Sequence, residues 1–109
     1  LIAEVTVRAI SQVRVSGHCA GLYHLAPAGE VSWFGYARHV LAVAKYAGVA
    51  LRVQPEQVGA ISSAKYPTPA RRPANSRLAC GRLEQMLGQQ MPQWQSGVDG
   101  ALRGLLPQD

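Results

Sequence analysis

A chain of 109 residues that is 48% hydrophobic can bury one core and is too apolar to be disordered. No apolar run reaches the roughly 20 residues of a membrane-spanning helix, so we expect no membrane partner. The balance of 11 Lys and Arg against 6 Asp and Glu gives a net charge of +5, which favours an anionic partner.

The chain opens on a predicted helix, because apolar residues recur at helical spacing from Leu1 until Ser16 and Gly17 break the pattern. Neither an initiator Met nor an N-cap residue precedes Leu1, so we expect the chain to start upstream of it. A short strand is predicted from Gly21 to Ala26, and residues 27–29 then turn the chain.

A second helix is predicted after Ser32, a good N-cap residue, and ends at Gly48. A second short strand is expected over residues 58–61. Two helices follow, a small one over residues 83–87 and a last one that Pro92 opens. The last helix is expected to turn these residues inward: Trp94, Val98, Ala101, Leu102 and Leu105. About four helices with two or more short strands predict an α/β fold.

The most informative segment is residues 66–78, YPTPARRPANSRL. Its prolines favour an extended backbone at the residue before each of them, so the loop is expected to be stiff and to lose little entropy on binding. Arg71 and Arg72 add planar donor forks suited to phosphate or carboxylate oxygens. The segment indicates either a preformed anion-recognition loop or a surface connection whose arginines are only solvated.

The candidate binding residues are Arg72, Arg71, Tyr66, Thr68, Asn75, Ser76 and Trp33. Tyr66 either stacks on a base or anchors the loop by burial. The periodicity around Trp33 favours core packing over stacking on a ligand, and it places Trp94 in the core. Arg77 is expected to support the fold by bonding backbone carbonyls.

The sequence holds no pattern for a metal site or for hydrolytic chemistry. Cys19 and Cys80 are far apart in the sequence and are interpreted first as small buried apolar residues, although a disulfide between them is not excluded. The histidines lack the spacing that would place two of them on one metal ion. There is no Gly-x-Ser-x-Gly elbow and no P-loop. Because the positive charges are dispersed, they favour a small phosphorylated ligand over a nucleic acid.

The chain resembles the C-terminal part of the dTDP-4-dehydrorhamnose reductase family, which belongs to the extended short-chain dehydrogenases/reductases. The resemblance runs from Leu1 to about Leu106 and is carried, in order, by LIAEVTVRAI, GLYHLAPAGEVSWFGYARHVLAVAKYAG, YPTPARRPANSRL, LEQMLG and MPQWQSGV. It implies that residues 1–109 are the substrate-binding lobe of such an enzyme. It also favours Arg72 as a ligand contact, because Arg72 occupies the Arg-Pro position of the family.

In that family, NADH or NADPH delivers hydride to the C4 ketone of a dTDP-linked deoxysugar, which completes dTDP-L-rhamnose for cell-envelope polysaccharide. The GxGxxG loop and the catalytic Tyr-x-x-x-Lys are absent from this sequence. The resemblance therefore implies a dTDP-sugar ligand and an N-terminal Rossmann domain as partner. We expect no catalytic residue, no cofactor bound by this chain alone, a tendency to self-associate and a cytoplasmic location.

The sequence departs from the family at two places. Phe34 and Gly35 stand where members often carry an acidic residue, and Gly104 stands near a magnesium-binding carboxylate that some members use for dimerisation, so metal-bridged pairing is not expected. One alternative is a non-catalytic homologue that acts as a regulatory or protein-interaction subunit. Another is a basic nucleic-acid-binding module, which rests on charge alone.

Overall fold

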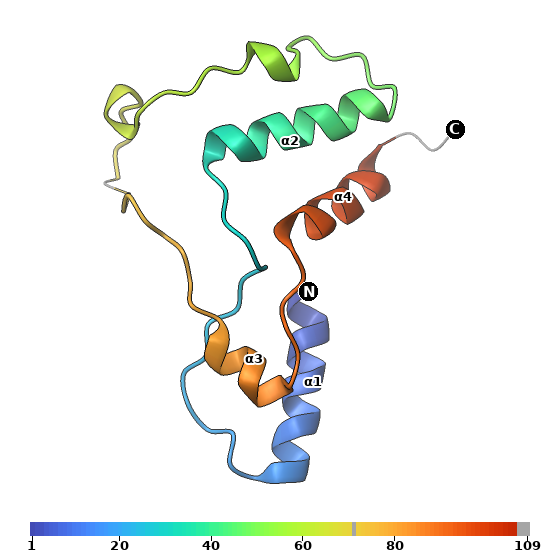
Figure 1. Cartoon of the computed structure of the whole chain (residues 1–109), viewed down its shortest axis with the longest axis vertical. Coiled ribbons are helices and arrows are strands. Elements are labelled where there is room, and N and C mark those ends of the chain that lie inside the picture. The colour runs from blue at the N-terminus through green and yellow to red at the C-terminus, as the bar shows by residue number, and fades with distance from the viewer. Residues whose placement is uncertain (71, 107–109) are drawn as a thin grey trace.

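The computed structural model describes residues 1–70 and 72–106, which form four α-helices (Figure 1). The helices are α1 (Ile2–Ser16), α2 (Trp33–Tyr46), α3 (Gly81–Leu87) and α4 (Trp94–Leu105). The long connection between α2 and α3 contains two short 3₁₀ turns, η1 (Pro55–Gln57) and η2 (Ser63–Lys65).

The helix ends follow the capping signals of the sequence. Gly17 has a φ of 66° and Gly88 a φ of 61°, a left-handed conformation that ends α1 and α3 at little cost only because these residues are glycines. At the start of α2, the Oγ atom of Ser32 accepts a hydrogen bond from the N–H of Gly35 at 3.2 Å. The four predicted helices are confirmed, and α4 begins shortly after Pro92 rather than at it.

The strand predicted from Gly21 to Ala26 does not form in the described part of the chain. Backbone groups of this segment form hydrogen bonds with side chains from the start of α3 rather than with a neighbouring strand. The guanidinium of Arg82 donates to the carbonyl of Leu22 at 3.1 Å, and the N–H of Ala26 donates to the Sγ atom of Cys80 at 3.2 Å. The segment is therefore held by side chains instead of a ladder.

The second predicted strand, residues 58–61, is also absent from the described residues, because no strand lies beside it and an isolated strand is not stable in water. The one β-bridge among the described residues is parallel and joins Ala28 to Gln93. The N–H of Ala28 donates to the carbonyl of Pro92 at 2.8 Å, and the N–H of Trp94 donates to the carbonyl of Ala28 at 3.0 Å. The α/β expectation is thus corrected to four helices without strands in the described chain.

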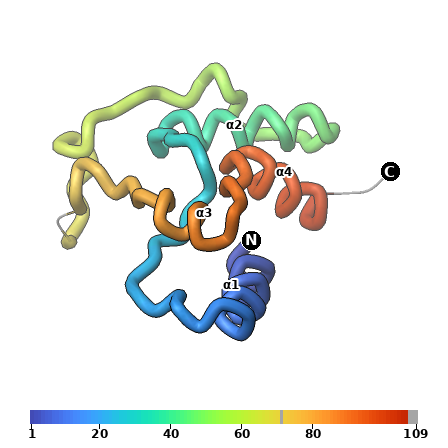
Figure 2. Tube along the Cα trace, turned by 60° about the horizontal axis from the view of Figure 1, so that its bottom comes forward, coloured from blue at the N-terminus to red at the C-terminus, as the bar shows by residue number. Residues whose placement is uncertain are grey.

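The helices pack in two groups that lie at opposite ends of the molecule (Figure 1). α1 packs against α3, where Val5, Leu83 and Met91 form a small core and are each no more than 5% exposed. α2 packs against α4 and η1, and buries Ala44. The connection from α2 to α3 first runs back alongside α2 through η1 and then continues at the edge of the molecule to α3 (Figures 1 and 2).

The arrangement is flat and open, with extents of 53 × 42 × 21 Å and a radius of gyration of 17.9 Å. A compact domain of this length has a radius of gyration of about 13 Å. The accessible surface is 8846 Å², against roughly 5900 Å² for a globular monomer of this mass. Large apolar side chains are exposed over several elements, among them Ile2, Val7, Ile10, Val15, Tyr46 and Leu105.

The face of α4 that was expected to point inward does so only in part. Val98 and Leu102 are half-buried, whereas Ala101 is exposed and Leu105 is 81% exposed. Among the described elements, α4 packs against α2, and this contact leaves Leu105 largely exposed. Within the described residues, no helix combines the length and the apolar character needed to cross a membrane.

Candidate functional site

The loop that the sequence singled out meets the start of α2 and forms a pocket with it. The pocket has a volume of about 420 Å³ and is lined by residues 30–32 on one side and residues 74–77 on the other. Asn75 and Ser76, two of the predicted binding residues, are part of this lining. Because Ser32 also caps α2, the pocket has a defined position relative to that helix.

Arg77 connects the two walls of the pocket. Its Nη1 atom pairs with the Oε2 atom of Glu30 on the opposite wall. The Oδ1 atom of Asn75 accepts hydrogen bonds from both the backbone N–H and the Nε atom of Arg77, each at 3.0 Å. The expectation that Arg77 bonds backbone carbonyls is therefore wrong, since these bonds go to side chains.

The other predicted residues of the loop that the structure describes, Tyr66, Thr68 and Arg72, lie outside the pocket lining. Arg72 is exposed and makes no hydrogen bond or ion pair within the described part of the chain, while Arg71 lies outside the described residues. The hydroxyl of Thr68 donates to the carbonyl of Ala70 at 2.8 Å. Tyr66 is 66% exposed, so it does not anchor the loop by burial.

Aromatic side chains mark the start of α2. Trp33 is 78% exposed, so the expectation that it packs in the core is wrong. Its ring contacts the ring of Tyr36 edge-on, with a centroid separation of 5.9 Å. Trp94, which was expected in the core, is half-buried and contacts Tyr36 at 5.9 Å and His39 at 4.9 Å between ring centroids. The Trp33 ring next to Ser32 is thus accessible to a ligand.

Sequence reasoning did not single out Glu30, and it gave Arg77 only a structural role. The two residues are 47 positions apart, and neither stands in a local motif for ion pairing. Only the return of the proline-rich loop to the start of α2 brings them together. The sole sequence signal was the polar character of the segment around Asn75 and Ser76.

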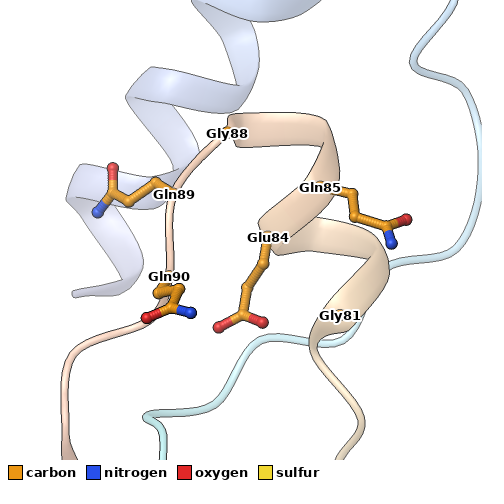
Figure 3. A pocket seen from close by; sticks show the side chains of 6 residues that line it. All are labelled: Gly81, Glu84, Gln85, Gly88, Gln89 and Gln90. Carbon is orange, nitrogen blue, oxygen red and sulfur yellow. The ribbon is translucent and has the colours of Figure 1, made fainter.

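A second pocket, of about 340 Å³, lies at the end of α3 (Figure 3). The side chains of Glu84 and Gln90 lie beside one another at this pocket. However, the Oε1 atom of Glu84 accepts the backbone N–H of Met91 at 2.8 Å, and the Oε1 atom of Gln89 accepts from Arg8 of α1. These polar groups therefore hold the end of α3 to its neighbours. None of the predicted binding residues that the structure describes lines this pocket.

Cys19 and Cys80 are free and half-buried, so the disulfide that the sequence left open does not form. Cys80 accepts the N–H of Ala26, which gives its thiol a structural contact. In the portion that the structure describes, no three His, Cys, Asp or Glu side chains gather as metal ligands would.

Comparison with known proteins places these features in a family context. The family model described as the RmlD substrate binding domain matches residues 1–106. The chain is 39% identical over 105 residues to a dTDP-4-dehydrorhamnose reductase of Escherichia coli K12, which covers 96% of this chain and 34% of that protein. The same enzyme name is carried by a relative from Sinorhizobium fredii, 39% identical over 107 residues, with 94% of this chain and 34% of that protein covered.

A dTDP-4-dehydrorhamnose reductase of Burkholderia thailandensis is 34% identical over 111 residues, and the match covers 98% of this chain and 37% of that protein. The chain therefore spans about a third of the length of the curated relatives it matches.

Proposed function

Because the chain belongs to the RmlD substrate binding domain family, we propose that it is the nucleotide-sugar-binding lobe of a dTDP-4-dehydrorhamnose reductase. The intact enzyme would reduce the C4 ketone of dTDP-4-dehydro-L-rhamnose with NADH or NADPH, in the biosynthesis of dTDP-L-rhamnose. The observation that carries this proposal is the family match, which runs over residues 1–106.

The binding residues of the proposal are those of the proline-rich loop and the start of α2. Arg72 serves the diphosphate, and its lack of a partner within the described residues leaves its guanidinium available. Asn75 and Ser76 line the pocket as neutral hydrogen-bonding groups. Tyr66 and Trp33 present exposed rings on which a base or a sugar can stack. Arg71 and Thr68 complete the proposed set.

The proposal also gives residues 1–109 a partner, an N-terminal Rossmann domain that holds the cofactor. The surface of the chain exceeds that of a compact monomer by about half. The apolar side chains exposed on α1 include Ile2 and Ile10, and this exposed apolar surface supports an interface on α1. We propose a cytoplasmic location for the enzyme.

The same exposed apolar surface supports the alternative of a non-catalytic subunit that binds another protein. In that case the lobe would keep its interface and would not bind a dTDP-sugar. Measuring dTDP-sugar binding by a protein that contains both this lobe and a cofactor domain therefore distinguishes the reductase from the non-catalytic subunit.

A chimera tests the proposal. The 105 matched residues of the Escherichia coli enzyme are replaced by this chain, so that the remaining two thirds supply the cofactor domain. We expect the chimera to oxidise NADPH in the presence of dTDP-4-dehydro-L-rhamnose. A folded chimera that binds NADPH, yet neither binds a dTDP-sugar nor reduces it, would overturn the proposal.

A further inference from the structure

Glu30 and Arg77 form an ion pair across the pocket between the start of α2 and the proline-rich loop. Among the described residues that line this pocket, Arg77 carries the positive charge and Glu30 the negative charge. These two charges cancel. A ligand phosphate that enters the pocket meets a guanidinium that already has a carboxylate partner.

The pair is exposed, with 64% of each side chain accessible to water. Water and salt screen such pairs, so Glu30 holds Arg77 only weakly. Asn75 holds the same guanidinium from the other side, through a 3.0 Å bond to the Nε atom. Arg77 can therefore exchange Glu30 for another anion and stay at the pocket wall, because its second fastening is independent of Glu30.

We propose that Arg77 is a phosphate contact of this pocket and that Glu30 is its built-in competitor, which lowers the affinity for anions. The inference rests on the proposed function, since it assigns two further residues to the recognition of the same nucleotide diphosphate. A diphosphate carries more charge than the single Glu30 carboxylate and offers several acceptor oxygens to the planar fork of Arg77. It therefore displaces the Glu30 carboxylate from Arg77.

Calorimetric titration of the 109-residue chain with inorganic pyrophosphate tests this inference. We expect Glu30→Gln to raise the affinity roughly two- to fivefold, which corresponds to the usual strength of an exposed ion pair. Arg77→Gln should lower it by about tenfold or more, because it removes a charge-assisted contact. In the double variant Glu30→Gln/Arg77→Gln, the gain from Glu30→Gln should vanish.

Glu4→Gln is the matched control. Glu4 is 66% exposed, against 64% for Glu30, and it pairs with Arg8 at 3.7 Å on α1, outside the pocket. The control changes the net charge by the same amount, so an equal gain in Glu4→Gln would show a general charge effect and would overturn the inference. Unchanged or lower affinity in Glu30→Gln would overturn it too.

The same titration with dTDP separates this inference from the proposed function. If the chain binds dTDP but Glu30→Gln has no effect, the competitor role is wrong and the proposed function stands. If pyrophosphate binds with the expected response to both substitutions and dTDP adds no affinity, the inference stands and nucleotide recognition by this lobe is contradicted. A wild-type chain that binds neither probe would overturn the inference.

Discussion

The Nε2 atom of His39 lies 2.7 Å from the Oδ1 atom of Asp99, and this contact joins α2 to α4. Both side chains are partly withdrawn from water, with 26% of His39 and 36% of Asp99 exposed. The ring of Trp94 packs edge-on against the same imidazole. Because α2 also carries Ser32 and Trp33 at its start, the His39–Asp99 contact helps to place the wall of the candidate pocket.

A double-mutant cycle checks this contact. We expect His39→Gln and Asp99→Asn each to lower the free energy of unfolding by about 0.5–1.5 kcal/mol, the usual net value of a partly exposed hydrogen bond. The double variant should lose less than the sum, because either single change already breaks the contact. The measurement is urea unfolding followed by circular dichroism. Strict additivity would mean that the contact does not couple the two helices.

The small core between α1 and α3 should be sensitive to truncation. Leu83 is 4% exposed and packs with Val5 and Met91, so Leu83→Ala leaves a cavity and should lower the free energy of unfolding by about 2–5 kcal/mol. Leu105→Ala is the control, because Leu105 is 81% exposed and its truncation should change stability by no more than about 0.5 kcal/mol. Equal effects of the two substitutions in urea unfolding would contradict the observed packing.

The exposed apolar side chains should make the chain self-associate as its concentration rises. Ile2 is 73% exposed and Ile10 is 56% exposed on α1, and water disfavours such surface. Light scattering should show a mass that increases with concentration, and Ile2→Lys with Ile10→Lys should reduce the increase. Gln85→Lys, which adds a charge at an exposed position of α3, serves as the control. A strict monomer over a wide concentration range would show that these side chains are not an interface.

The chain alone should not reduce dTDP-4-dehydro-L-rhamnose. This prediction rests on the sequence, which contains neither a GxGxxG loop nor a Tyr-x-x-x-Lys pair. The oxidation of NADPH, followed by its absorbance, should stay at the level of a protein-free control. Turnover that increases in proportion to the concentration of the purified chain would contradict this expectation.

The helices were predictable from local signals, whereas the strands were not. Ser32 caps α2, and Gly17 and Gly88 end α1 and α3, because capping depends on neighbouring residues alone. A strand depends on a distant partner, and the segment 21–26 instead has its backbone held by Arg82 and other side chains from the start of α3. The residue types that suggested strands therefore could not show whether a partner strand is present, and both strand predictions were wrong for the described residues.

The site was predictable to a similar extent. Of the predicted loop residues that the structure describes, Asn75 and Ser76 line a pocket, whereas Tyr66, Thr68 and Arg72 do not. The pairing of Arg77 with Glu30 depends on how the loop returns to α2, which no local pattern encodes. Trp33 was expected in the core because periodicity describes the helix face and not what covers that face.

Substitutions at Arg72 provide the direct test of the anion-recognition loop. In the chimera with the cofactor domain, we expect Arg72→Ala to weaken dTDP-sugar binding by about 1.5–3 kcal/mol, or roughly ten- to a hundred-and-fifty-fold, because one charge-assisted contact is lost. Arg72→Lys should recover only part of this affinity, since an ammonium cannot reproduce the planar fork. Calorimetry should show NADPH binding unchanged in both variants.

Two controls make this result specific to the loop. Arg52→Ala removes the same charge from an exposed position beyond the other end of α2 and should leave dTDP-sugar affinity unchanged. A nucleic-acid-binding module would behave differently, because it would lose oligonucleotide affinity with each arginine removed and would show a steep dependence on salt. If a folded Arg72→Ala chimera kept its full dTDP-sugar affinity, the loop would be a structural connection between η2 and α3, and the exposure of Arg72 would reflect solvation alone.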